Sequence, residues 1–69
     1  MSEPWAQPHL ERAHEIAEDL HSVVELLDEL IVDHLREAVA NEYQGRPELD
    51  KRMQSARRAV EKAARLLDQ

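Results

Sequence analysis

The stretch that most constrains the fold runs from Val23 to Val39 and reads VVELLDELIVDHLREAV. Ten of its seventeen residues are apolar. They do not alternate as in a strand. Their steps of three and four residues are typical of an α-helix. The apolar face is wider than the seam of a two-stranded coiled coil, so this helix needs more than one neighbour to cover it.

Composition indicates a small all-helical domain. The chain has 69 residues, with one Gly, three Pro, no Cys and 35% charged residues. Chains of this length rarely bury enough apolar surface alone and usually add disulfides, a metal or oligomerisation. Without cysteine the disulfide route is closed. No secretory signal or membrane-spanning run is visible, so we expect a cytoplasmic protein that does not enter a membrane.

The periodicity predicts two helices, over residues 8–43 and 47–67. Pro8 fits the first turn of a helix, Gly45 can close the first helix, and Pro47 can begin the second. We expect residues 1–7 to be a flexible arm and residues 8–69 to be one antiparallel helical hairpin. The predicted seam consists of Leu10, Ala13, Ala17, Leu20, Val24, Leu27 and Ile31 on the first helix, and Leu49, Met53, Ala56, Val60, Ala63 and Leu67 on the second. Alanines on the second helix allow a close approach.

Charge favours the same pairing. Residues 8–43 hold ten acids and two bases, whereas residues 47–68 hold four acids and six bases. Each exposed ion pair contributes at most about 1 kcal/mol, so charge selects the partner helix more than it stabilises the fold.

The two helices differ in length, and this difference predicts association. A short connection lets the second helix reach back only to residues 22–24. An uncovered apolar stripe forfeits several kcal/mol at about 25 cal/mol per Å². We therefore expect a homodimer resembling a four-helix bundle. The stripe consists of Leu10, Ala13, Ile16, Ala17 and Leu20, and the residues expected in the core or dimer interface are Val24, Leu27, Leu30, Ile31, Leu35, Met53, Val60 and Leu67.

The alternative is a three-helix bundle with a break near Ser22. Ser22 and Glu25 have the Ser-x-x-Glu spacing of a capping box. The helices would then cover residues 8–20, 23–43 and 47–67. No Gly or Pro lies nearby, so the continuous helix is preferred.

Two Glu-x-x-His units, Glu11–His14 and Glu18–His21, raise the possibility of a metal site. Di-iron and di-manganese bundles use this unit together with carboxylates on other helices. A metal-binding bundle using His14, Glu18, His21 and Glu25 is one alternative function. The preferred interpretation is a solvated acidic face with no cofactor, because these residues lie beside the apolar seam.

His34, Arg58, Lys62 and Arg65 also have two interpretations each. We expect His34 to pack at the seam and bond a carboxylate of the other helix; a pH-sensitive contact is the alternative. Arg58, Lys62 and Arg65 form a basic stripe that could meet nucleic acid. The net charge of −6 and the lack of interleaved aromatic residues argue against that role.

The preferred function is a small acidic protein-interaction module, of an adaptor, chaperone-like or antitoxin-like inhibitor type. No nucleophile setting, phosphate-binding loop or carboxylate pair suggests an enzyme or a small-molecule site. We expect partners to be a second copy and another protein. Trp5 either caps the open end of the bundle or anchors a partner. The predicted partner-binding residues are Trp5, Leu10, Ile16, Ala17 and Leu20.

Overall fold

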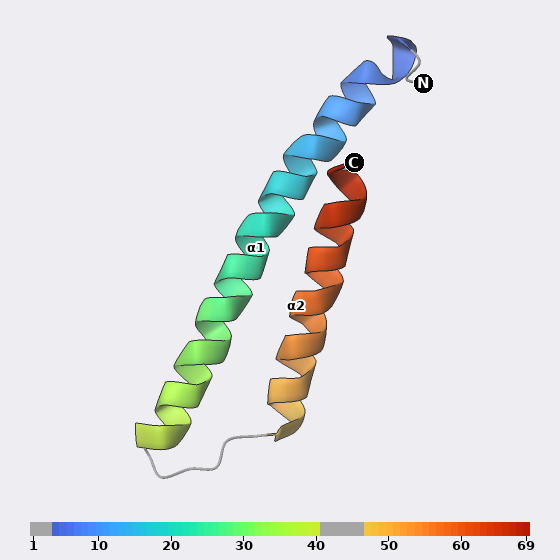
Figure 1. The fold of residues 1–69 in the computed structure, drawn as a ribbon. Coiled ribbons are helices and arrows are strands. Elements are labelled where there is room, and N and C mark those ends of the chain that lie inside the picture. Colours follow the sequence, from blue (N-terminus) through green and yellow to red (C-terminus); the bar gives the residue numbers. More distant parts are fainter. Residues whose placement is uncertain (1–3, 41–46) are drawn as a thin grey trace.

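The computed structural model describes residues 4–40 and 47–69 and forms an antiparallel helical hairpin (Figure 1). A short 3-10 helix, η1 (Pro4–Ala6), leads into α1 (Gln7–Ala40), and α2 (Pro47–Leu67) returns along it. The described residues contain no strand. The molecule is a rod with extents of 58 × 16 × 11 Å. The predicted all-α hairpin is therefore confirmed.

The long helix α1 is continuous through Ser22, so the three-helix alternative is wrong. Ser22 Oγ donates to the carbonyl oxygen of Glu18 at 3.3 Å. This bond to the preceding turn is the one that a serine inside a helix makes, whereas a capping serine accepts from the following turn. With no Gly or Pro nearby, nothing interrupts the backbone ladder. The predicted end of this helix at Tyr43 and the turn at Gly45 lie outside the described residues.

The core is a narrow seam between the two helices. Its buried members are Ala17, Val24 and Ala38 on α1 and Met53 and Ala64 on α2. Ala17 and Ala64 are fully buried, and such small side chains let two helix backbones approach closely. Large aliphatic residues such as Ile31 and Val60 are only half-buried beside them. The seam therefore leaves much apolar surface at its edges.

The predicted seam of α2 needs one correction. Ala56 is exposed, whereas Ala64, which was not among the predicted seam residues, is fully buried. The observed seam steps from Met53 through Arg57 and Val60 to Ala64, so a half-buried arginine occupies a position that the apolar pattern assigned to its neighbour. A prediction based on the spacing of apolar residues does not detect a polar residue at a seam position.

The register of the hairpin also differs from the expectation. The end of α2 does not stop beside residues 22–24. His21 Nε2 lies 3.8 Å from Asp68 Oδ2, and His14 Nε2 lies 3.2 Å from the carbonyl oxygen of Gln69. The connected end of the hairpin explains why α2 reaches this far. Asp50 lies beside His34, so the first turn of α2 lies alongside the last turns of α1 and not beyond its end at Ala40. The far end of α2 consequently covers Ala17.

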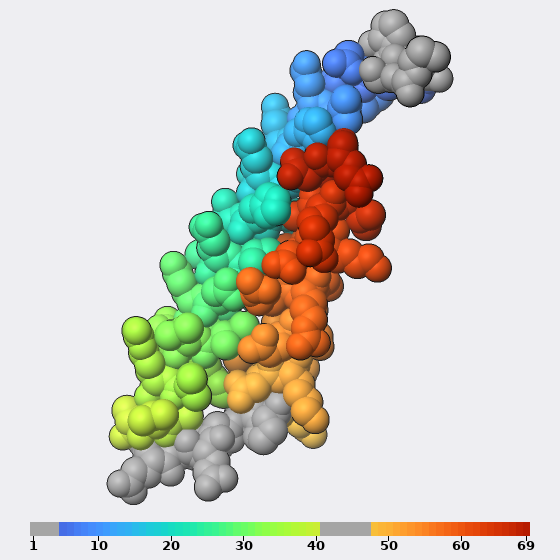
Figure 2. Space-filling view, in the orientation of Figure 1, coloured from blue at the N-terminus to red at the C-terminus, as the bar shows by residue number. Residues whose placement is uncertain are grey.

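The uncovered N-terminal overhang is shorter than predicted. Both figures show the beginning of α1 projecting past the C-terminal end of α2 (Figures 1 and 2). Trp5 is 71% exposed on this overhang, so it does not cap the hairpin. Leu10 is half-buried. Within residues 4–40 and 47–69, neither helix combines the length and apolarity that crossing a membrane would require.

Candidate interaction surface

One side of the hairpin carries most of the polar contacts between the helices, and we call it the polar flank. The guanidinium of Arg57 on α2 bonds the carboxylate of Asp28 on α1 through Nε and, at 3.3 Å, through Nη2. Its Nη1 also contacts Glu61 Oε2 at 3.3 Å. The hydrogen bond and the charge of Asp28 raise the pKa of Arg57 above its ordinary value. Desolvation opposes this shift, and the charge and hydrogen bond of Glu61 add to it. Arg57 therefore stays charged at every physiological pH.

His34 is held at the seam by a carboxylate of the other helix. Its Nδ1 lies 2.8 Å from Asp50 Oδ1, and its side chain is mostly buried. This contact is the one expected from the sequence. Together with the bond between Asp28 and Arg57, it fixes the lengthwise register of the two helices.

The opposite side of the hairpin is apolar. Residues seven apart lie on the same side of a helix. His14, His21 and Asp28 form one such series and lie on the polar flank, as their contacts with α2 show. Ile16, Val23 and Leu30 form a second such series. Each of them is one residue before a seam residue, namely Ala17, Val24 or Ile31. This position places the second series on the other side of the seam.

The second helix adds to the same apolar side. The polar sides of α1 and α2 both lie on the polar flank of the hairpin. The opposite sides of the two helices therefore lie together on the other side of the hairpin. Leu26 completes this side on α1, and Leu66 is the large residue on α2. We call the whole surface the apolar flank: Ile16, Val23, Leu26 and Leu30 on α1, and Leu49, Ala56, Ala59, Ala63 and Leu66 on α2.

The large side chains of the apolar flank are open to solvent. Leu26 and Leu66 are each 62% exposed, Leu30 is 51% exposed, and Val23 is also exposed. Ile16 is half-buried at one end of the surface. Isolated exposed leucines are normal on proteins, but several large exposed apolar side chains gathered on one side of two helices are typical of an interaction surface.

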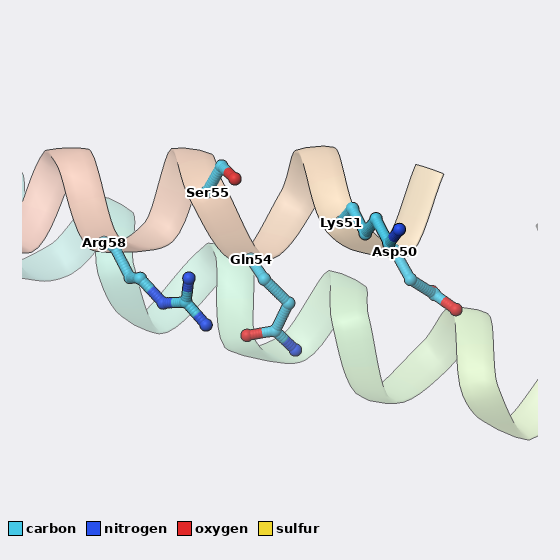
Figure 3. A pocket seen from close by; sticks show the side chains of 5 residues that line it. All are labelled: Asp50, Lys51, Gln54, Ser55 and Arg58. Atoms are coloured by element: carbon cyan, nitrogen blue, oxygen red, sulfur yellow. The ribbon is translucent and has the colours of Figure 1, made fainter. Parts of the chain in front are cut away.

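A shorter apolar stripe on α1 has polar surroundings. Val32, Leu35 and Val39 are exposed, and Leu35 matches Leu26 at 62%. They lie towards the polar flank near the connected end of the hairpin. At this level α2 carries a shallow hollow of about 390 Å³. The side chains that line the hollow are polar, and all of them belong to α2 (Figure 3). These are Asp50, Lys51, Gln54, Ser55 and Arg58. No apolar surface on α2 extends this stripe.

The alternative sites suggested by the sequence gain little from the structure. Across residues 4–40 and 47–69, no three His, Asp or Glu side chains are grouped so that they could hold a metal ion. His14 and His21 instead approach the C-terminal end of α2. In the basic stripe, Arg65 Nη1 lies 3.6 Å from Glu61 Oε1, and its three residues are exposed.

The predicted partner-binding residues are divided by the observed register. Ile16 lies on the apolar flank, Leu20 is half-buried beside it, and Leu10 and Trp5 lie on the overhang. Ala17 is fully buried by α2 and offers no surface. Sequence analysis did not single out Leu26 or join Leu66 to α1. Matching the charged positions of the two helices would have placed them on one side.

Comparison with known proteins finds no matching family model, no similar curated protein and no similar solved structure. The function is therefore inferred from the geometry of the two helices.

Proposed function

We propose that this protein is a small helical interaction module that binds a polypeptide through its apolar flank. The observation that carries the proposal is the exposure of Val23, Leu26 and Leu30 on α1 and of Leu66 on α2. Burying a leucine side chain contributes about 1.5–3 kcal/mol relative to leaving it in water, so four such residues supply a large driving force for association.

The polar flank supports the same assignment by being unsuited to binding. Polar side chains on it already contact the other helix, Asp28 with Arg57 and His21 with Asp68. A partner helix or helix pair that presents its own apolar face fits the apolar flank, because amphipathic helices dock along such strips. The module then serves as an adaptor or regulator, with no chemistry of its own.

A photo-crosslinking residue placed at position 26 tests this function. Leu26 and Leu35 are equally exposed, but only Leu26 lies on the apolar flank, so position 35 is the matched control. We expect polypeptide adducts, identified by mass spectrometry in expressing cells and with the purified protein, at position 26 and not at position 35. Equal labelling at both positions, or none at position 26, would contradict the proposal.

A further inference from the structure

The apolar flank is suited to one occupant in particular, a second copy of this chain. The hairpin exposes 5869 Å² of surface. A compact protein of 8.0 kDa exposes about 4,450 Å². The excess is roughly 1,400 Å², and a standard protein interface removes about 800 Å² from each partner. A copy laid along the flank would therefore remove about half of this excess from each chain.

Two symmetric arrangements can bring two such flanks together. A two-fold axis parallel to the helices places α1 of each copy over α2 of the other. A two-fold axis perpendicular to the helices places α1 over α1 and α2 over α2. Both bury the same residues, so apolar contact alone does not choose between them.

Charge chooses the first arrangement. Helix α1 holds nine acids and two bases, whereas α2 holds three acids and six bases. Placing α1 over α1 would set acidic surfaces against each other, and like charges across an interface are unfavourable. Placing α1 over α2 sets a helix of net negative charge against one of net positive charge.

Two single residues show the same complementarity. Asp33 on α1 and Arg52 on α2 lie seven residues from Leu26 and Ala59, and therefore on the same sides of their helices, and both are exposed. The contacts of His34 with Asp50 and of Asp28 with Arg57 set these two residues at the same level of the hairpin. Rotation about a parallel axis causes no shift along the helices, so Asp33 of each copy faces Arg52 of the other.

Size is complementary as well. Leu26 and Ala59 lie two residues beyond the pair Asp28 and Arg57, and therefore also share a level. In the same arrangement Leu26 projects over Ala59 of the second copy, so a large side chain meets a small one.

We propose that two copies associate through their apolar flanks about a two-fold axis parallel to the helices, with α1 of each over α2 of the other and Asp33 paired with Arg52 across the interface. The inference rests on the proposed function and names its partner. It predicts a dimeric four-helix bundle in which every neighbouring pair of helices is antiparallel, with both N-terminal overhangs at the same end.

Sedimentation equilibrium of charge variants tests the proposal. Reversing one charge, as in Asp33→Arg or Arg52→Asp, alters two symmetric contacts, and we expect the dimer Kd to rise at least threefold. The double variant that exchanges the two charges should return Kd to within about twofold of the native value. Circular dichroism confirms that each variant stays helical. Rescue by the exchange supports the proposal, and two additive losses overturn it.

The symmetry is tested by distance. The chain has no cysteine, so Gln7→Cys introduces a single site for a spin label near the N-terminal end of α1. Diagonal helices of a bundle lie about 14 Å apart, so labels at the same end should give a distance below about 35 Å. Labels at opposite ends of a rod 58 Å long would give a distance close to that length and overturn the arrangement.

Failure of this inference is distinct from failure of the proposed function. A chain that remains monomeric at millimolar concentration overturns the dimer. Crosslinks from position 26 to another protein would still support an interaction module. Equal labelling at positions 26 and 35 would overturn the module itself.

Discussion

At the level of single residues, the most informative side chain is Arg57. It lies at a seam position and is half-buried, yet its guanidinium contacts Asp28 on the other helix and Glu61 on its own. Because its pKa is raised, the charge and the stability it brings are present below its ordinary pKa and are lost only as pH rises beyond the raised pKa. The pair thus works as a fixed register mark, not as a pH switch.

Removing the acceptor tests this role. We expect Asp28→Ala to lower the melting temperature by a few degrees, because the half-buried Arg57 loses its carboxylate partner on the other helix. Adding Arg57→Leu should recover the loss, since leucine extends the apolar seam. Arg12→Ala is the control: Arg12 pairs with Glu15 at 2.9 Å where both side chains are 64% exposed. Such exposed pairs contribute little. An equal loss in Arg12→Ala would contradict the assignment.

Sequence reasoning about single residues succeeded where one residue type had one natural partner. His34 interrupts an apolar face, so a carboxylate on the facing helix was the obvious way to satisfy it, and Asp50 supplies it. Arg57 was missed because an arginine in a pattern of apolar spacing looks like a neighbour of the seam. Its long apolar stem allows it to lie in the seam while the charged group reaches Asp28.

At the level of elements, the two helices could be predicted but their register could not. The expected start and end of α2, Pro47 and Leu67, are those observed. A seam that repeats every seven residues keeps its apolar contacts when one helix slides by a repeat, so periodicity cannot fix the slide. The contacts of Asp50 and Arg57 with α1 fix it, and they decide that the far end of α2 covers Ala17.

The continuity of α1 has its own test in Ser22→Ala. In a continuous helix alanine is the better residue, so we expect a gain of about 0.5 kcal/mol in unfolding free energy. If Ser22 capped a separate helix, the same change would cost about 1 kcal/mol. Ser55→Ala is the control, because Ser55 is an exposed serine inside α2 and should give a similar gain. Urea unfolding at one fixed protein concentration measures both. A loss in Ser22→Ala alone would contradict a continuous α1.

At the level of the whole molecule, the hairpin is unusually extended for its mass. The radius of gyration of its Cα atoms is 16.8 Å. A compact chain of this length would have about 11 Å. A rod of two helices can bury only one narrow strip, which explains why the largest apolar side chains remain at its edges. Association along the rod covers those edges, whereas association at its end does not.

Small-angle scattering separates these two modes by shape. Leu26→Glu places a charge on the apolar flank, so we expect it to remain a monomer with a radius of gyration near 17 Å, whereas Leu35→Glu should associate as the native chain does. Two rods side by side, with axes about 10 Å apart, would double the mass and raise the radius only to about 18 Å. Rods joined end to end through the overhang bearing Trp5 would reach about 33 Å, given a length of 58 Å and a radius of gyration of 16.8 Å for each rod. A radius near 33 Å at doubled mass would therefore return the binding surface to the overhang.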